Sequence, residues 1–386
     1  MVGGSGQKAR KMKPPVRNAA LDSLARRVVD QGAAPAAVAT VGWRKHGRWH
    51  LALGAAGVRS SERTEAATAA SVFDLASLTK PFVAVTVARE AARRGIALSV
   101  PVGDIHPTLT HTSLGSRSLE SLLAHRAGLL PHLRLFDDHQ ARRVFCREAG
   151  LRAAASALRS GLLPSAALQD YPAVYSDLGY LIAGAVLERL CDKPLDALVQ
   201  EHVAGPLGLA AGSVRWWLSH GASVTRFVPT ENVPWRGGEL VAQTHDENAW
   251  QWAGHGLAGH AGLFGTAAAV CRFGIAAVET RAGRCESWLP AGVLEPLLRR
   301  RDDSSLRAGF DGKAAEGSSA GALCGPETFG HLGFTGTSFW CDPEAEIVMV
   351  LLTNRVNPSR EGSHLGTIRP LVHDQLFTHA RAAQQG

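Results

Sequence analysis

The sequence predicts an α/β fold of the α+β type, in which one antiparallel sheet is flanked by helices and stands beside a separate helical lobe. Strand-compatible runs occur near both ends of the chain, at residues 37–54 and 329–353, whereas Ala- and Leu-rich helical patterns dominate residues 82–265. Strands at both ends with helices between them imply that the two ends pair in one sheet. We therefore expect a sheet lobe of residues 19–81 and 266–386, a helical lobe of residues 82–265, and an active site at their junction.

Local patterns then assign the elements in chain order. They predict a helix ending near Gly32, a hairpin of 37–44 and 48–54, helices of 79–94, 178–190 and 195–203, strands of 329–333, 335–341 and 346–353, and a final helix of 368–383. Pro81 is compatible with the predicted helix of residues 79–94 because it falls in the first turn, where a backbone N–H would have no partner within the helix.

Composition and charge indicate a globular protein. Of 386 residues, 45% are apolar and 19% are charged, and no run of about 18 apolar residues could span a bilayer. The N-terminus is basic with no apolar run behind it, so we expect neither a secretory signal nor a membrane partner. We therefore expect the protein to be cytoplasmic. Five basic residues in the first 17 account for most of the net charge of +7, namely Lys8, Arg10, Lys11, Lys13 and Arg17. We interpret residues 1–18 as a basic flexible tail and expect no nucleic-acid binding.

The cysteines and histidines predict no metal site. Six cysteines are scattered without a C-x-x-C pair, and the sixteen histidines form no H-E-x-x-H motif. We expect reduced thiols, no metal and no cofactor, and the sequence leaves the oligomeric state open.

The strongest chemical signal is Ser77-Leu78-Thr79-Lys80, where an extended segment turns into a helix. Residues three apart share a helix face, so the Lys80 ammonium can reach the Ser77 hydroxyl. A serine at a helix N-terminus also lies where developing negative charge is stabilised. Partial desolvation would lower the pKa of Lys80 and let it accept the serine proton. The spacing alone also allows a structural alternative, in which Ser77 caps the helix and Lys80 is solvated.

Three ordered motifs change that balance: residues 73–82 (FDLASLTKPF), 175–177 (YSD) and 331–333 (HLG). Together they resemble the nucleophile motif, the Tyr-x-Asn element and the Lys-Thr-Gly strand of the serine β-lactamase and penicillin-binding-protein superfamily, especially its class C β-lactamase-like and esterase branch. The resemblance spans about residues 20–380 and implies a β-lactamase/transpeptidase-like fold. Further matching segments are 122–129, 205–209, 229–231, 244–249 and 259–266.

The resemblance implies a role for each motif residue. Ser77 would form an acyl-enzyme, and Lys80 and Tyr175 would share general-base and general-acid duty. The oxyanion hole would be the backbone N–H groups of Ser77 and Phe334. Asp177, His331 and Gly333 would contact the substrate, and Asp177 could equally cap the helix that follows it.

Departures from the family pattern bear on the substrate. His331 and Leu332 stand where β-lactam-active members carry Lys and Thr, and Asp177 replaces Asn. Both changes disfavour anionic β-lactams, so we expect a serine hydrolase with esterase-like activity on small neutral esters or amides. The alternatives are a β-lactamase or D-Ala-D-Ala carboxypeptidase, and a non-catalytic binding protein on the same fold. Asp177 could pair with Lys80 or orient a substrate amine, and the sequence does not decide between these roles.

Overall fold

The main sheet is formed by strands from both ends of the chain. A computed structural model describes residues 14–136, 145–162 and 170–386. Within them the sheet has eight strands in the order β1-β3-β2-β13-β12-β11-β10, with β4 beside β3. Their bounds are β1 Val16–Arg17, β2 Ala36–Lys45, β3 Arg48–Ser60, β4 Arg63–Ala66, β10 Asp311–Gly312, β11 Phe329–Leu332, β12 Ser338–Asp342 and β13 Ile347–Thr353. β2 pairs antiparallel with β13, which confirms the predicted union of the two ends.

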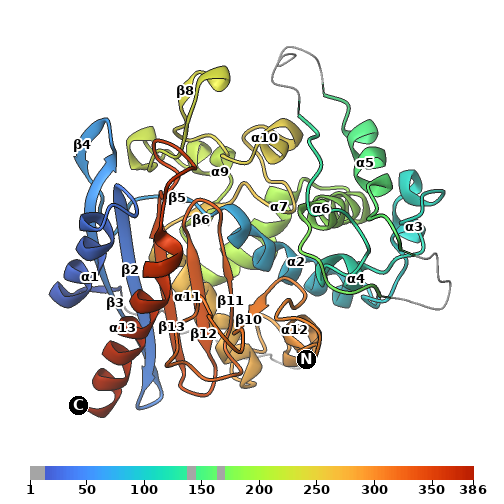
Figure 1. Ribbon diagram of the computed structural model, residues 1–386. Coiled ribbons are helices and arrows are strands. Elements are labelled where there is room, and N and C mark those ends of the chain that lie inside the picture. Colours follow the sequence, from blue (N-terminus) through green and yellow to red (C-terminus); the bar gives the residue numbers. More distant parts are fainter. Residues whose placement is uncertain (1–13, 137–144, 163–169) are drawn as a thin grey trace, which may run out of the picture.

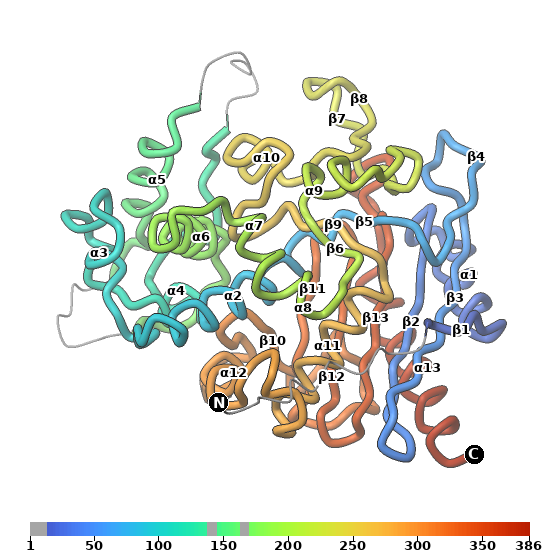
Figure 2. Tube along the Cα trace, turned by 180° about the vertical axis from the view of Figure 1, so that it is seen from behind, coloured from blue at the N-terminus to red at the C-terminus, as the bar shows by residue number. Residues whose placement is uncertain are grey.

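Helices cover both faces of this sheet, so its central strand reads as a continuous apolar run. All seven residues of β13 are buried. α1 (Ala19–Asp30) and α13 (Leu365–Gln385) pack on one face, and α11 (Ala267–Arg281) packs on the other. Figures 1 and 2 view the molecule from opposite sides: α13 lies in front of the sheet in Figure 1, and α11 lies in front of it in Figure 2.

A lobe rich in helices lies beside the sheet, at the right of Figure 1. Its helices and the neighbouring α12 are α2 Thr79–Arg93, α3 Val102–Ile105, α4 Leu119–Leu123, α5 Arg147–Ser156, α6 Asp177–Cys191, α7 Leu195–Val199, α8 Gly205–Leu207, α9 Val214–Ser219, α10 Glu247–Ala253 and α12 Ala291–Leu298. The region also contains short strands that the sequence did not predict, β6 Ala211–Gly212, β7 Asn232–Val233, β8 Gly238–Glu239 and β9 Phe264–Gly265. β9 pairs with β6 and with β5 (Phe73–Asp74), which joins this region to the segment before Ser77.

Among the predicted boundaries that differ from the structure, two bear on the site and on the tail. The strand expected to begin at residue 335 begins at Ser338, because the Thr335 and Thr337 hydroxyls instead donate hydrogen bonds to the carbonyl oxygens of Asp74 and Leu75. Val16–Arg17 form β1, which pairs parallel with β3, so these two residues belong to the sheet rather than to a tail. The other basic residues on which the tail prediction rests lie outside the described residues.

Helix length and hydropathy bear on the membrane question. Among the described residues, no helix is both long and apolar enough to cross a bilayer.

Candidate active site

The backbone before Ser77 is fixed by a buried carboxylate. Asp74, at the end of β5, accepts hydrogen bonds from the backbone N–H groups of Ala76 (2.8 Å) and His245 (2.7 Å). Ala76 has a φ of 47°, a left-handed conformation that a non-glycine residue adopts only when its surroundings impose it. Burial raises the pKa of the Asp74 carboxyl, and the two N–H donors offset only part of that effect. Ser77 is thereby held in the 3₁₀ turn Ala76–Leu78 that leads into α2.

Lys80 is buried and points at Ser77. Its Nζ lies 2.8 Å from Ser77 Oγ, 2.7 Å from Asp177 Oδ1 and 3.3 Å from the carbonyl oxygen of His260. The N-cap residue of α2 is Leu78 rather than Ser77, and the Lys80 side chain has no exposed surface. The structural alternative of a capping serine and a solvated lysine is therefore wrong.

The ion pair with Asp177 changes the expected protonation of Lys80. Burial acts to lower the pKa of Lys80 and is the largest influence, but the Asp177 carboxylate and the Tyr175 hydroxyl together outweigh it, so the pKa is raised. The expectation of a lowered pKa is wrong, because it considered desolvation without the partner 2.7 Å away. Lys80 is an ammonium in the resting protein.

Tyr175 completes the cluster from the segment that precedes α6. Lys80 Nζ lies 4.8 Å from the centre of its ring, and Lys80 and Ser77 both act on its hydroxyl. Burial raises the pKa of Tyr175, the nearby Lys80 ammonium lowers it, and Asp177 raises it, so the net shift is upward. The resting phenol is neutral, and it can donate or accept a proton in the same network as Ser77.

Asp177 is the first residue of α6, and its predicted capping role is wrong. The N-cap is Ser176, whose hydroxyl accepts from the Gly179 N–H at 3.4 Å. Of the roles that the sequence left open for Asp177, the structure places it in the ion pair with Lys80.

His125 supports Tyr175, and the sequence analysis assigned it no role. Its ring stacks on the Tyr175 ring with centroids 4.6 Å apart, and its Nδ1 accepts the Ser176 N–H at 3.0 Å. Burial, with repulsion from Lys80, lowers the pKa of His125 well below its usual value, so the ring is neutral. The only sequence signal for it was its place in the matching segment 122–129.

His331 lies on β11 with its ring toward Tyr175, at a centroid distance of 6.0 Å. Its Nδ1 is 2.7 Å from the Leu332 carbonyl oxygen, which can only accept, so Nδ1 carries the proton and Nε2 does not. Burial, and then the Lys80 charge, lower the pKa of His331 to about 3. A neutral imidazole therefore stands where the family pattern has an ammonium.

The segment after His331 approaches the backbone just before Ser77 closely, and glycine makes this possible. A Cβ on Gly333 would lie 2.0 Å from Thr337 Oγ1 and 2.7 Å from the Leu75 carbonyl oxygen. Phe334 follows and lines the same cavity as Ser77. The oxyanion hole formed by the two backbone N–H groups stays a prediction.

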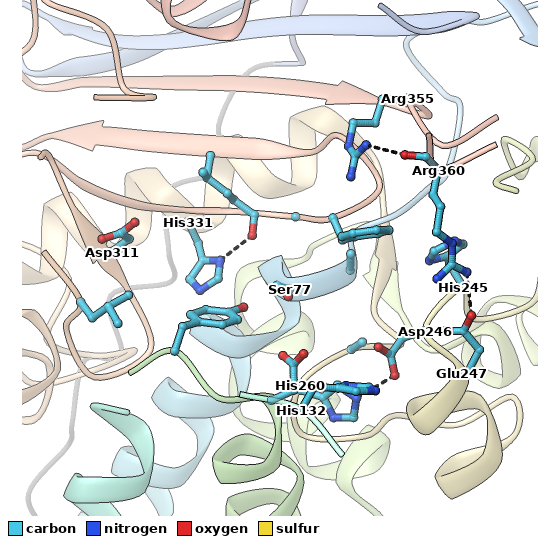
Figure 3. Close-up of a pocket in the computed structure, with 18 of the residues that line it drawn as sticks. Ser77, His132, His245, Asp246, Glu247, His260, Asp311, His331, Arg355 and Arg360 are labelled. Atoms are coloured by element: carbon cyan, nitrogen blue, oxygen red, sulfur yellow. Dashed lines mark hydrogen bonds and ion pairs between the residues drawn. The ribbon is translucent and has the colours of Figure 1, made fainter. Parts of the chain in front are cut away.

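These residues line a cavity of about 670 Å³, a size suited to a small organic substrate. In Figure 3, His331 and Asp311 lie on one side of Ser77, and His245, Glu247, Arg355 and Arg360 lie on the other.

The second side of the cavity is organised by ion pairs. Arg360 contacts the carboxylates of Glu231 and Glu247 at 2.6 Å each, and His245 Nε2 donates to Glu231 at 2.8 Å. Burial acts to raise the pKa of Glu231, but hydrogen bonds from His245 and Arg360 hold it at about 2. These residues come from the matching segments 229–231 and 244–249, to which the sequence analysis gave no individual roles.

The described part of the chain contains no cluster of three or more His, Cys, Asp or Glu side chains arranged to hold a metal ion. The Ser77 cluster consists of groups suited to acyl transfer by proton donation and acceptance.

Known proteins resemble this chain in sequence. A Beta-lactamase family model matches residues 21–372. A Putative D-alanyl-D-alanine carboxypeptidase from Salmonella paratyphi B is 29% identical over 219 residues, 53% of this chain and 48% of the relative. The chain thus spans about half the length of the curated relatives that it matches.

Solved structures share the fold at low identity. EstCE1, a hydrolase with promiscuous acyltransferase activity, has a TM-score of 0.68 at 21% identity, covering 92% of this chain and 97% of that one. The D-amino acid amidase from Ochrobactrum anthropi SV3 has a TM-score of 0.67 at 16% identity, covering 94% and 98%. A class C β-lactamase from Rhodobacter sphaeroides has a TM-score of 0.66 at 16% identity, covering 94% and 99%. At these identities the likeness establishes the fold alone.

Proposed function

Because the chain belongs to the Beta-lactamase family of serine hydrolases, we propose that it hydrolyses small esters or amides through an acyl-enzyme at Ser77. One observation carries the proposal: Lys80 Nζ lies 2.8 Å from Ser77 Oγ and 4.8 Å from the centre of the Tyr175 ring, which lines the same cavity as Ser77. This arrangement places a nucleophile and two proton-transfer groups in one cavity.

In the proposed acylation, Ser77 Oγ attacks the carbonyl carbon while its proton passes to Lys80 or Tyr175. The same group then protonates the departing alcohol or amine, and the bond to the leaving group breaks. A water molecule attacks the acyl-enzyme by the same route and regenerates Ser77. Since the pKa of Lys80 and that of Tyr175 are both raised, the reactive form with one of them deprotonated is a minor one at neutral pH. The rate should therefore rise with pH.

The substrate class follows from the groups beside Ser77. The neutral His331 ring offers no positive charge to the substrate, whereas β-lactam-active members carry a lysine there. The printed activities of the structural neighbours, a hydrolase with promiscuous acyltransferase activity and a D-amino acid amidase, are consistent with ester or amide chemistry on this fold. We propose that the substrate group facing His331 is neutral.

The test compares hydrolysis of p-nitrophenyl butyrate and of the matched p-nitroanilide by the wild type, Ser77→Ala and Ser23→Ala. Ser23 is an exposed serine on α1, outside the cavity, and controls for loss of a hydroxyl. We expect Ser77→Ala to fall by about 10³-fold or more and Ser23→Ala to match the wild type. Undiminished turnover by Ser77→Ala, or no turnover of either substrate by the wild type, would contradict the proposal.

A further inference from the structure

Lys80 has a third oxygen partner besides Ser77 and Asp177, namely the backbone carbonyl oxygen of His260. The distance from Lys80 Nζ to this oxygen is 3.3 Å. An ammonium has three N–H bonds, so the three oxygens match its donors in number. When Lys80 is deprotonated, its two remaining N–H bonds can stay on Asp177 and His260, and the lone pair then points at Ser77 Oγ. The place of the His260 carbonyl therefore affects the direction in which Lys80 accepts the serine proton.

The His260 side chain is held by a carboxylate. His260 is 1% exposed, and its Nε2 lies 2.8 Å from Asp246 Oδ1, a contact drawn in Figure 3. An ionised carboxylate only accepts, so Nε2 carries the proton of this bond. Among the described residues, Nδ1 of the same ring has no hydrogen-bond partner. Loss of Asp246 would leave both nitrogens of a buried imidazole unsatisfied, which is costly.

Asp246 is itself fixed by α10. It is the N-cap residue of that helix, and its Oδ1 accepts the Ala249 N–H at 2.7 Å as well as the bond from His260. Burial acts to raise the pKa of Asp246, but the His260 ring and the Ala249 N–H outweigh it, so the pKa is lowered and the carboxylate is ionised. One oxygen thus ties the start of α10 to the His260 ring.

The residue before Asp246 is tied to the other reacting group. The His245 N–H donates to Asp74, the buried carboxylate that fixes the backbone before Ser77. Two consecutive residues therefore lead to both members of the Ser77–Lys80 pair, His245 through Asp74 and Asp246 through His260.

The backbone on either side of His260 is fixed at two points. A Cβ on Gly259 would lie 1.7 Å from the Tyr180 carbonyl oxygen, so this glycine allows the segment to approach α6 closely. The Leu263 N–H donates to Thr79 Oγ1 at 3.2 Å, at the start of α2. The contact with Asp246 fixes His260 between these two points.

We propose that Asp246 and His260 form a positioning pair, in which the Asp246 carboxylate holds the His260 ring so that the His260 carbonyl directs Lys80 toward Ser77. The inference rests on the proposed hydrolysis at Ser77 and adds two residues that act on it through Lys80. Neither side chain exchanges a proton with the substrate. Loss of the pair should slow the transfer of the Ser77 proton, because misplacement of an accepting group is costly in rate.

Substitutions at Asp246 separate this role from helix capping. Asp246→Asn keeps an oxygen that can accept from both Ala249 and His260. Asp246→Ser keeps an oxygen that can cap α10, but its side chain is shorter and withdraws that oxygen from His260. His260→Leu removes the ring N–H and leaves the cap intact. Asp30→Ser is the control, since Asp30 is exposed at the end of α1, outside the cavity.

The experiment measures the second-order rate constant for fluorophosphonate labelling of Ser77, together with the final number of adducts per chain. We expect Asp246→Ser and His260→Leu to label about tenfold more slowly or less, and still to reach one adduct per chain. Asp246→Asn should restore the rate to within about threefold of the wild type, and Asp30→Ser should equal the wild type. A merely structural role would lower the number of reactive chains and leave their rate unchanged, which would overturn the proposal.

The double variant and the pH dependence sharpen the test. Asp246→Ser combined with His260→Leu should be no slower than the slower single variant, because both substitutions break the same contact. The rising limb of the pH profile should stay in place or move toward lower pH, since the Lys80 ammonium loses an acceptor. Effects that add in the double variant, or a limb displaced to higher pH, would contradict a role through the position of Lys80.

Crystal structures of the wild type and of Asp246→Ser separate this inference from the hydrolysis itself. We expect the distance from Lys80 Nζ to the His260 carbonyl oxygen to exceed about 3.5 Å in the variant and to remain a hydrogen bond in the wild type. Absence of Ser77 labelling in the wild type would contradict the proposed hydrolysis, and the two structures would then decide on the pair. Equal labelling rates in the wild type and Asp246→Ser, or an unmoved His260 carbonyl, would overturn the positioning role alone.

Discussion

Two cations that line or adjoin the cavity, Lys80 and Arg369, differ in whether a carboxylate pairs with them. On the Ser77 wall the buried Lys80 ammonium has its counter-charge, Asp177, at 2.7 Å. Arg369, which lines the same cavity, is 8% exposed against 0% for Lys80, and it has no carboxylate partner among the described residues. The first wall is complete before any ligand arrives, as preorganised catalytic groups must be. The side with Arg369 instead holds a cation that no carboxylate of the described residues neutralises.

The largest effect should come from the Ser77 wall. Lys80→Met removes the group that contacts both Ser77 and Asp177, and leaves the Asp177 carboxylate without its partner. We expect kcat/KM to fall by about 10³-fold or more, in steady-state assays on p-nitrophenyl butyrate. Lys193→Met, which removes an exposed lysine paired with Glu201 on the protein surface, is the control and should keep wild-type activity. A kcat/KM of Lys80→Met within tenfold of the wild-type value would contradict the role assigned to Lys80.

Asp177→Asn should move the pH dependence of activity. The Asp177 carboxylate raises the pKa of Lys80 and that of Tyr175, so its removal lowers both. The deprotonated form that accepts the serine proton then becomes populated at lower pH, and the rising limb of kcat/KM moves toward lower pH. If the limb moves by about one pH unit, the population of that form at a given pH on the limb increases about tenfold. A pH series from 5 to 10 tests this, and an unmoved limb or one displaced to higher pH would contradict the assigned pairing.

Glu231→Gln should change how stability depends on pH. The folded-state pKa of Glu231 is about 2, below its ordinary value of 4.5, so its contribution is present above that value and is lost as pH falls toward 2. The contribution is about 3 kcal/mol at most. Urea unfolding at pH 7 and pH 3 should show the wild type losing more stability than Glu231→Gln across this interval. Equal losses would mean that the Arg360 and His245 contacts do not stabilise the fold.

Arg369→Met should have the smallest effect on stability. Replacing an unpaired buried cation by an apolar side chain of similar length removes a desolvation cost and breaks no ion pair. We expect the free energy of unfolding to stay within about 0.5 kcal/mol of the wild type or to increase. A clear loss, measured by urea denaturation, would show that the guanidinium has a structural partner and would break the contrast between the walls.

Patterns that repeat locally were sufficient to predict most of the fold. The β2–β3 hairpin and α2 follow from periodicity and turn residues, and the pairing of β2 with β13 follows from strands at both ends of the chain. The start of β12 was wrong because two threonine hydroxyls bind the backbone before Ser77, a contact over 260 residues apart in sequence. Such long-range contacts leave no local signal.

The site was predictable as far as its motifs extend. Ser77, Lys80 and Tyr175 meet as the resemblance implied. The raised pKa of Lys80 required the distance to Asp177, and the support of Tyr175 by His125 required the folded contact. The unpaired state of Arg369 could not be predicted from the sequence, because it depends on which side chains surround the guanidinium in the folded protein.

The most direct test of the central claim, that Ser77 is the nucleophile, is peptide mass spectrometry of the wild-type protein after reaction with a fluorophosphonate. The geometry predicts one adduct per chain, located on Ser77, with labelling that becomes faster as pH rises because the accepting groups lose their protons. Lys80→Met should label at a small fraction of that rate. An adduct on a different residue, or none at all in a folded protein, would contradict the account.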